Sequence, residues 1–428
     1  MQTKIISNIS EFKYKALSFA NTFDICCFLD SNGLDDRYSK FDCLIAFGHQ
    51  DKLILKPNED SFSALKNFRK KNNGFILGGL SYELKNEIEN LDSKNQDGLN
   101  FPNLFFFSPL HLLIIKGKKL QIISPDANDI FKLIDETIVK KDITDLKVNI
   151  KARLNPTDYR NKFLKIKNEI SLGNIYETNF CMEFYDENCE ISPIDIFIKL
   201  NIKSPTPFAN FFKWNDKYII SATPERFLAK RNQKIISQPI KGTAKRSENS
   251  VEDIKIMKSL YLNPKERQEN VMIVDLVRND LTKFAIKGTV KVEELFGIYS
   301  FKHIHQMVST VVCEIHNDTD NIDVIKNCFP MGSMTGAPKI KAMQLMDLYE
   351  NSKRGMYAGA IGYFDNENDF DFNVIIRSIL YNSSNKYLSF HVGSAITHDA
   401  DPEKEYDECL LKIKAILEIL QNKKGDLI

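Results

Sequence analysis

Lys241 lies in the segment QPIKGT, residues 238–243, between a proline and a glycine. Pro239 fixes a backbone dihedral angle just before the lysine, and Gly242 permits backbone conformations that other residues avoid. This arrangement indicates a lysine amine that is directed at a site. The alternative is a surface turn with a solvated lysine, because most lysines in proteins are exposed.

Two pairs of glutamates with the spacing E-x-x-E begin two separate helices. Glu266 and Glu269 follow an asparagine and a proline, and Glu405 and Glu408 follow an aspartate and a proline, which are signals for a helix start. Glutamates three residues apart project from one face of a helix. The two pairs together could bind Mg²⁺, with waters and a substrate oxygen completing the octahedral shell. Either pair alone is also explained as a solvated first turn that the helix dipole favours.

A glycine-rich segment, FPMGSMTGAPK at residues 329–339, leads into an expected amphipathic helix with Ile340, Met343 and Met346 on its apolar face. Such an entry presents free backbone N–H groups to an anion. The spacing does not match a phosphate-binding loop.

Arg377 is the one charged residue in the apolar run VIIRSIL, residues 374–380. An unpaired guanidinium in such a run would be costly to bury. We therefore expect an anionic partner for Arg377, from the protein or from a ligand.

Two β-hairpins are expected to position Lys241. Residues 208–214 and 217–223 flank the dipeptide Asn-Asp, and residues 227–231 and 234–240 flank Asn-Gln, both of which are two-residue turn signals.

A tight second turn places Glu225 across from Ile240, one residue from Lys241. Strict register would put Glu225 and Lys241 on opposite faces of the sheet. Because Pro239 cannot donate to a strand ladder, it indicates a bulge that would correct this register. The alternative for the pair is an ordinary cross-strand ion pair.

The remaining elements are an α+β mixture. A charged connector over residues 141–156 leads into a helix over residues 157–173, with Thr157 as its N-cap and Gly173 as its stop. A strand over residues 175–180 then carries Glu177 and Asn179 on one face, either the wet face of an edge strand or part of a site. Further strands are expected at residues 25–29, 43–47, 52–55, 75–80, 104–107, 110–115, 355–364, 372–380 and 387–396.

Composition excludes several classes of protein. The 428 residues are 43% hydrophobic and 27% charged, with a formal net charge of +1, which indicates ordinary globular material and no nucleic-acid-binding surface. No apolar run is long enough for a membrane span and no secretory signal is visible, so we expect a cytoplasmic protein. The eight cysteines follow no metal-binding or disulfide spacing, which indicates reduced, buried thiols.

The ordered motifs IYETN, TPERF, PIKGT, NPKERQEN, FPMGSMTGAPK, GAIGY, IIRSI and DPEKEYDE identify the chain, by resemblance, as a member of the chorismate-utilising enzymes. The resemblance covers residues 155–425 and is fainter before them. It implies an α+β fold like that of anthranilate synthase component I, with mostly antiparallel sheets packed against helices. We expect an N-terminal β-rich subdomain over residues 1–150 and a chorismate-binding catalytic domain over residues 151–428, the two intertwined.

The resemblance also implies a site. The two glutamate pairs would hold Mg²⁺ against a ring carboxylate of chorismate. Oxygens elsewhere on the substrate would be bound by Thr243, Thr335, Tyr363, Arg377, Lys412 and backbone N–H groups near Gly393.

Lys241 separates two branches of the family. Anthranilate synthases resemble this chain but usually carry alanine at that position, whereas aminodeoxychorismate synthases use the lysine as a nucleophile on C2 of the ring. In that reaction Glu225 protonates the departing C4 hydroxyl, and ammonia from a glutamine amidotransferase partner then enters at C4. We expect burial, Lys245 or Arg246 to lower the pKa of Lys241, and we expect a raised pKa for Glu225.

The chain departs from the family pattern at a few positions. Gln306 stands where a histidine is common, with His305 one residue earlier, and Ala395 replaces a glycine, which requires a negative φ there. Isochorismate-forming relatives carry a lysine base where this chain has Glu177. No tryptophan-binding pattern is visible in the N-terminal third. The alternatives to amination at C4 are an anthranilate synthase component I and a chorismate-binding subunit without catalysis.

Overall fold

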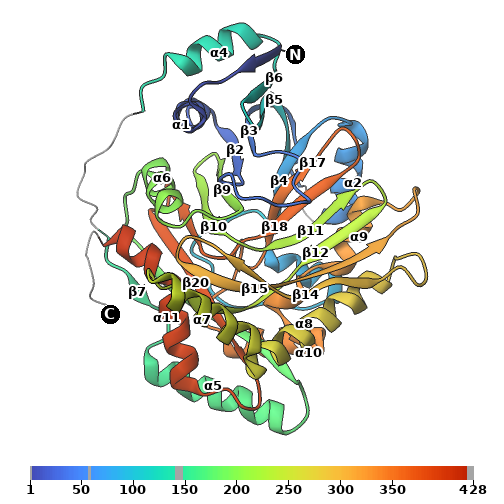
Figure 1. Cartoon of the computed structure of the whole chain (residues 1–428), viewed down its shortest axis with the longest axis vertical. Helices are drawn as coiled ribbons and strands as arrows, with labels where there is room; N and C mark the ends of the chain where they lie inside the picture. The colour runs from blue at the N-terminus through green and yellow to red at the C-terminus, as the bar shows by residue number, and fades with distance from the viewer. Residues whose placement is uncertain (1, 56–58, 140–147, 422–428) are drawn as a thin grey trace.

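The structure, a computed structural model, describes residues 2–55, 59–139 and 148–421, and within them twenty strands form one antiparallel network that helices surround (Figure 1). The strands are β1 (Gln2–Ile5), β2 (Ile25–Asp30), β3 (Cys43–Lys52), β4 (Ile76–Leu80), β5 (Leu104–Lys116), β6 (Lys119–Ile123), β7 (Lys151–Ala152), β8 (Glu177–Asp186), β9 (Phe208–Trp214), β10 (Lys217–Thr223), β11 (Arg226–Arg231), β12 (Lys234–Gln238), β13 (Ile240–Lys245), β14 (Lys291–Ser300), β15 (Ile304–Glu314), β16 (Gly336–Ala337), β17 (Ala360–Phe364), β18 (Phe370–Val374), β19 (Ser378–Asn382) and β20 (Tyr387–Ile396).

The helices lie around the strands. They are α1 (Ile9–Ala20), α2 (Ser61–Lys71), α3 (Lys85–Glu89), α4 (Ala127–Asp135), α5 (Pro156–Ser171), α6 (Pro193–Lys203), α7 (Ser250–Leu262), α8 (Pro264–Thr282), α9 (Asn321–Cys328), α10 (Lys339–Tyr349) and α11 (Pro402–Leu420), with short 3₁₀ turns η1 (Tyr82–Leu84) and η2 (Gly332–Met334). The mixture of helices and antiparallel strands is the α+β class that the sequence predicts.

Strand β5 joins the two halves of the network. Its first residues pair with β4 and its later residues pair with β3. From β4 the pairing continues through β17, β18, β11, β12 and β15, and from β3 it continues through β2, β9, β10, β19, β20 and β8. Consecutive phenylalanines at 105–107 in β5 are fully buried, and each such side chain contributes about 1.5–3 kcal/mol when it leaves water.

The pairing crosses the boundary that we expected at residue 150. Strand β2 pairs with β9, and β4 pairs with β17. Two large clusters of buried side chains form the core, and each draws on residues from both sides of that boundary.

The N-terminal part contains helices that the sequence analysis did not predict. Helices α1, α2 and α4 lie among the predicted strands, and α2 is capped by the Asp60 side chain at the N–H groups of Phe62 and Ser63. The segments expected as separate strands at residues 104–107 and 110–115 form the single strand β5, and residues 53–55 lie outside β3.

Several local predictions are confirmed and others are wrong. Both two-residue hairpin turns are present, but the expected strand over residues 372–380 is broken into β18 and β19. The N-cap of α5 is Asn155 and not Thr157, because Pro156 occupies the first helical position. In α10, Ile340 is exposed, while Met343 and Met346 are buried. Residues 141–147 of the expected connector lie outside the described residues.

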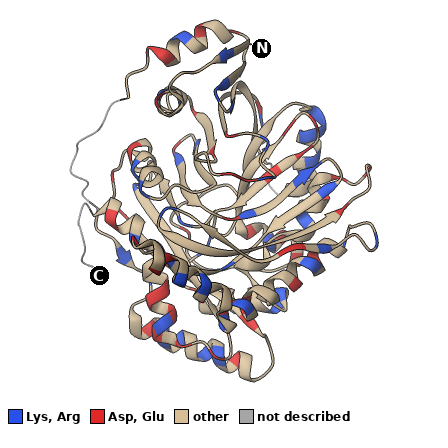
Figure 2. Ribbon diagram, in the orientation of Figure 1, with Lys and Arg blue, Asp and Glu red and all other residues tan. Residues whose placement is uncertain are grey.

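The distribution of charged side chains and the burial of the cysteines agree with what the composition indicates. Acidic and basic side chains alternate along the outer helices, as Figure 2 shows for α5, α8 and α11. The eight cysteines are buried with free thiols. Among the described residues, no helix combines the length and the apolar character needed to cross a bilayer.

Candidate active site

Lys241 lies near the start of β13, just after Pro239 separates that strand from β12. Gly242 has a φ of +90°, in the left-handed region that favours glycine. The pairing of β13 with β15 shifts register between Ile240 and Thr243, which interrupts the alternation of side chains at the lysine. The Lys241 side chain is 11% exposed and lines a pocket. The prediction of a directed lysine is confirmed.

Glu225 reaches the same pocket from the residue before β11. The pairing of β11 with β12 shifts register between Arg226 and Ala229, so the extra residue lies in β11 and not at Pro239, where we expected it. One bulge is therefore on the opposite strand of the hairpin from the predicted one, and the second register shift, in β13, follows directly after Pro239.

The carboxyl group of Glu225 is buried, with 4% of the residue exposed. Burial raises its pKa to about 7, although a hydrogen bond from Ser333 and the charge of Lys241 oppose the rise. The Ser333 hydroxyl donates to Glu225 Oε1 at 2.5 Å. The predicted rise in the pKa of Glu225 is confirmed.

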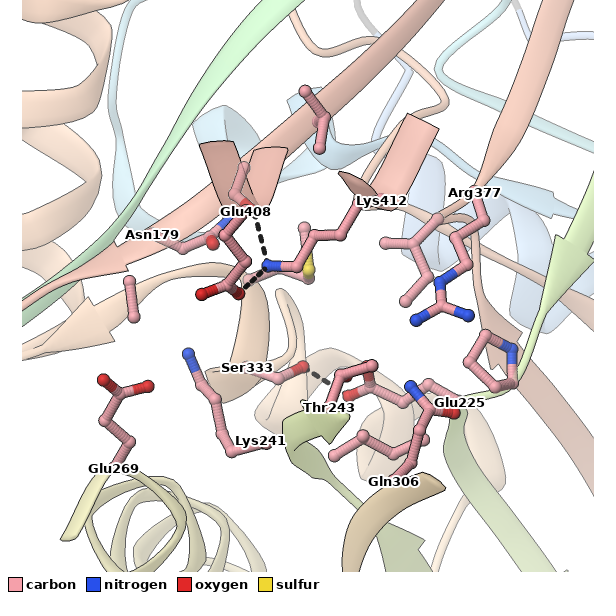
Figure 3. Close-up of a pocket in the computed structure, with 18 of the residues that line it drawn as sticks. Asn179, Glu225, Lys241, Thr243, Glu269, Gln306, Ser333, Arg377, Glu408 and Lys412 are labelled. Carbon is pink, nitrogen blue, oxygen red and sulfur yellow. Dashed lines mark hydrogen bonds and ion pairs between the residues drawn. The ribbon is translucent and has the colours of Figure 1, made fainter. Parts of the chain in front are cut away.

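The pocket holds about 810 Å³ of empty space, part of it open to solvent. In Figure 3 the ends of Lys241, Glu269 and Glu408 point to one side of it, and Glu225, Gln306 and Arg377 gather on the other. Its lining is mainly polar or charged and comprises Asn179, Pro224, Glu225, Ile240, Lys241, Gly242, Thr243, Glu266, Glu269, Gln306, Ser333, Met334, Tyr357, Ile376, Arg377, His391, Val392, Gly393, Ala395, Glu408, Lys412 and Ile413.

The nearest charged partner of Lys241 is acidic. Its Nζ lies 3.9 Å from Glu177 Oε1. The guanidinium of Arg246 instead bonds to Asp253 at 2.7 Å and to a backbone carbonyl. The charge of Arg246 is therefore paired with a carboxylate of its own.

Glu177 and Asn179 share a buried face of β8, with 2% and 7% of each residue exposed. Strand β8 is not an edge strand, since it pairs with β20, β7 and β16. The wet-face alternative is wrong for both residues. Glu177 Oε2 is buried without a hydrogen-bond partner among the described residues.

Arg377 lies at the break between β18 and β19 with a φ of +51°, which is uncommon for a residue with a side chain. Its guanidinium lines the pocket, and among the described residues it has no ion pair within 4.0 Å. Burial lowers the pKa of Arg377 to about 10, partly offset by Glu225, so the group remains charged at neutral pH. This charge is available to an anionic ligand.

Lys412, Gly393 and Thr243 also line the pocket as predicted. Lys412 Nζ donates to the Gly393 carbonyl at 3.0 Å and pairs with Glu408 at 2.7 Å. A Cβ atom at Gly393 would lie 2.8 Å from the Asn179 side chain, so glycine is required for this close approach. Ala395 lies within β20 and has no positive φ.

Two residues that were predicted to contact the substrate do not line the pocket. Tyr363 is buried in β17 against Phe41 and Phe75, with ring centroids 5.8 and 6.1 Å away, and it does not line the pocket. The Thr335 hydroxyl donates to the backbone carbonyls of Met331 and Gly332, so it is not directed into the pocket.

Three of the four predicted metal ligands line the pocket: Glu266, Glu269 and Glu408. Glu266 and Glu269 lie in the first turns of α8, whose N-cap is Asn263, and Glu408 lies in α11. Burial and the charges of Glu269 and Glu408 raise the pKa of Glu266 to about 7. This repulsion between carboxylates is what a bound cation would relieve.

The fourth residue, Glu405, does not line the pocket. Its carboxylate pairs with Lys265 Nζ at 2.7 Å, and burial raises its pKa. It is nevertheless buried, as are Cys409, Ile416 and Leu420 further along α11.

Carboxylate oxygens are the donors that Mg²⁺ prefers, but the carboxylate oxygens of Glu266, Glu269 and Glu408 do not all lie within 4.8 Å of one another in this structure. Glu269 Oε1 is buried with no hydrogen-bond partner among the described residues, although Lys265 Nζ is 3.7 Å away. A second acidic group, Asp365, Glu367 and Asp369, lies far along the chain, and the ammonium of Lys40 already bonds to all three carboxylates.

Gln306 and His305 have different surroundings. Gln306 is buried in β15 and lines the pocket, and its Oε1 has no hydrogen-bond partner among the described residues. His305 does not line the pocket and bonds to Ser300 and Asp253. The residue at the histidine position of the family pattern is thus a neutral amide.

The sequence analysis missed three residues of the site. Ser333 lies inside the glycine-rich segment, but nothing in that segment indicated a bond to Glu225. Tyr357 and His391 stack with centroids 5.2 Å apart at the pocket wall. Tyr357 lies in a turn before β17 and His391 lies in β20, and because the two are far apart in the sequence, local patterns carry no signal for their contact.

A family model described as chorismate binding enzyme matches residues 25–418. The chain belongs to this family. Among curated proteins it is 30% identical to an anthranilate synthase component I-like protein of Synechocystis sp. over 81% of this chain and 73% of that protein. It is 28% identical to aminodeoxychorismate synthase component 1 of Bacillus subtilis over 81% of this chain and 77% of that protein. The match to an aminodeoxychorismate synthase of Streptomyces griseus is 36% identical but covers 61% of this chain and 36% of that protein.

Solved structures share the fold. Anthranilate synthase component I of Streptococcus pneumoniae superposes with a TM-score of 0.77 at 22% identity, over 89% of this chain and 93% of that chain. The two similarities together define an enzyme class that acts on chorismate, with the α+β fold described above.

Proposed function

We propose that this chain aminates chorismate at C4 to give 4-amino-4-deoxychorismate, the precursor of p-aminobenzoate. The observation that carries the proposal is that Lys241 and Glu225 line one pocket together with the guanidinium of Arg377, which has no ion pair among the described residues. Ammonia would come from a separate glutamine amidotransferase partner. The resemblance of the segment QPIKGT to aminodeoxychorismate synthases supports this branch of the family over anthranilate synthase.

Substrate binding uses charges of both signs in the pocket. Arg377 would bind one carboxylate of chorismate, because its guanidinium has no protein ion pair among the described residues. Lys412 is held by Glu408 and the Gly393 carbonyl and would contribute a further donor.

Glu266, Glu269 and Glu408 would hold Mg²⁺, with Glu405 as an outer support. When bound, Mg²⁺ would neutralise a substrate carboxylate and screen the repulsion between these glutamates.

In the first chemical step the neutral Lys241 amine attacks C2, and the double bonds of the ring shift as the C4–O bond breaks. Glu225 gives its proton to the departing oxygen, which leaves as water. A pKa of about 7 keeps enough Glu225 protonated for this role at neutral pH.

In the second step ammonia attacks C4 and the bond between C2 and the lysine nitrogen breaks. Lys241 departs as a neutral amine, and the new C4 ammonium returns one proton to the Glu225 carboxylate. The net reaction consumes chorismate and ammonia and releases water. Atoms and charges balance over the two steps.

Intact-protein mass spectrometry tests the nucleophile. Incubating the chain with chorismate and Mg²⁺ in the absence of ammonia should give a covalent adduct with the mass of chorismate less one water, located at Lys241 by peptide mapping. Lys241→Ala should give no adduct. Aminodeoxychorismate formation by Lys241→Ala at the unaltered rate would refute the assignment.

A further inference from the structure

We infer that Glu177 takes the proton of the Lys241 ammonium and so generates the amine that attacks the substrate. This inference rests on the proposed function, because it concerns how the nucleophile of that reaction becomes neutral. It adds a second carboxylate to the chemistry of the lysine, distinct from the acid Glu225.

Glu177 and Lys241 form a buried ion pair. Oε1 of Glu177 lies 3.9 Å from Lys241 Nζ, and the side chains are 2% and 11% exposed. Oε2 of Glu177 is buried without a hydrogen-bond partner among the described residues. A buried carboxylate with few donors is poorly stabilised as an anion and is therefore a competent proton acceptor.

The position of Glu177 in the sheet fixes this contact. Strand β8 is held on one side by β20 and at Glu177 itself by β16, where Glu177 pairs with Ala337. A Cβ at Gly336, the neighbour of Ala337, would lie 2.3 Å from the Glu177 carbonyl, so the backbones are packed tightly there. The backbone that carries the Glu177 carboxylate is therefore fixed in place.

Proton transfer within the pair is balanced. The Nζ–H bond of the ammonium breaks, a bond from that proton to a Glu177 oxygen forms, and the ion pair becomes a neutral amine and a neutral carboxylic acid. Burial raises the pKa of Glu177, with the nearby charge of Glu269 adding to the rise and Lys241 opposing it. The other charged groups that act on this pair are Glu225 before β11 and Glu408 on α11.

The role of proton acceptor and the role of simple ion-pair partner predict opposite results for Glu177→Gln. If Glu177 accepts the proton, its removal forces the lysine to lose a proton to solvent before it attacks. If Glu177 only stabilises the ammonium, its removal makes the neutral amine more available. The rate of adduct formation should fall in the first case and rise in the second.

The experiment measures the single-turnover rate of the Lys241 adduct by rapid quench and mass spectrometry, from pH 6 to 9, with chorismate and Mg²⁺. Dividing the Glu177→Gln rate by the unaltered rate at each pH cancels the titration of Glu225. We expect a ratio of about 10⁻² to 10⁻³ at pH 7, rising by about tenfold per pH unit as solvent takes over the deprotonation. Glu177→Asp keeps a carboxylate that can accept the proton. Its adduct rate should therefore be lower than that of the unaltered chain by a ratio that does not change with pH.

Glu183→Gln is the matched control, because Glu183 is a buried glutamate on the same strand that pairs with Arg153. Its adduct rate should keep the pH dependence of the unaltered chain. A ratio for Glu177→Gln that is equal to or above one at every pH would overturn the inference alone. Absence of any adduct in the unaltered chain would overturn the proposed function and this inference with it.

Discussion

Ser333 donates a hydrogen bond to Glu225 Oε1 at 2.5 Å inside the pocket, so the acid of the proposed reaction is held by one of its two oxygens. The backbone N–H of Ile240 also donates a hydrogen bond to this carboxyl group. Because a donated hydrogen bond favours the charged carboxylate, Ser333 also limits the rise that burial causes in the pKa of Glu225.

Adduct formation should therefore lose activity above about pH 7, where Glu225 loses its proton. Ser333→Ala should move this loss to higher pH, because the remaining burial raises the pKa of Glu225 further, and should lower the maximal rate by about tenfold through lost orientation. The pH profile of single-turnover adduct formation checks both effects. Ser389→Ala is the control, since Ser389 donates to the buried Glu183 in the same way. If the pH profile of Ser333→Ala matches that of the unaltered chain, the proposed effect of Ser333 on the pKa of Glu225 is refuted.

Gly242→Ala should both destabilise the chain and misdirect Lys241. A φ of +90° strains any residue with a Cβ, and this Cβ would lie 3.0 Å from Glu266 Oε2. We expect a loss of about 1–3 kcal/mol in the free energy of unfolding and a slower adduct. Gly173→Ala, at a φ of +77° with open space around its Cβ, should lose stability without slowing the adduct. Equal adduct rates for the two variants would contradict the role assigned to Gly242.

Metal-free protein should lose stability as the pH rises from about 4.5 to about 7, because the folded state keeps Glu266 protonated up to about pH 7. The penalty is absent below the pKa of the unfolded chain and complete above that of the folded one. Glu266→Gln should stabilise the metal-free chain at pH 8 by about 1–2 kcal/mol, measured by urea unfolding.

With Mg²⁺ present, the unaltered chain should become more stable than Glu266→Gln, because Mg²⁺ stabilises only a chain that binds it. The gain on adding Mg²⁺ should be larger for the unaltered chain than for Glu266→Gln. The exposed Glu403→Gln on α11 is the control and should match the unaltered chain. Equal gains for Glu266→Gln and the unaltered chain would remove Glu266 from the metal site.

Arg377→Gln should weaken chorismate binding by about 10- to 100-fold, the value of a charge-assisted hydrogen bond. Calorimetry in a Lys241→Ala background avoids turnover. The ligand-free chain should keep or gain stability, because the substitution removes a desolvated charge that has no ion pair in the part of the chain that the structure describes. Arg278→Gln, at an exposed surface pair, is the control. Tight binding by Arg377→Gln would show that other groups hold the carboxylates.

Short sequence patterns correctly predicted the features that depend only on residues close together in the chain, namely helix caps and tight turns. Asn263 and Asp401 cap the two helices that carry the glutamates because a cap needs only the next few residues. The two-residue turns fix hairpin register for the same reason. The sequence thus predicted the α+β class and the convergence of Lys241 with Glu225.

Contacts between segments far apart in the sequence determine which of the other predicted residues line the pocket. Tyr363 and Glu177 both lie on strands, and the local pattern does not say which face meets the pocket. Their surroundings come from distant segments, β4 beside β17 and β16 beside β8. Glu405 likewise lies outside the pocket, where it pairs with Lys265, a residue 140 positions away in the sequence.

A product assay tests the central claim most directly. The purified chain is incubated with chorismate, Mg²⁺ and a high concentration of ammonium, with and without added aminodeoxychorismate lyase. We predict p-aminobenzoate only in the presence of the lyase, which requires amination at C4. Fluorescent anthranilate formed without the lyase would contradict the claim and would make the chain an anthranilate synthase despite Lys241.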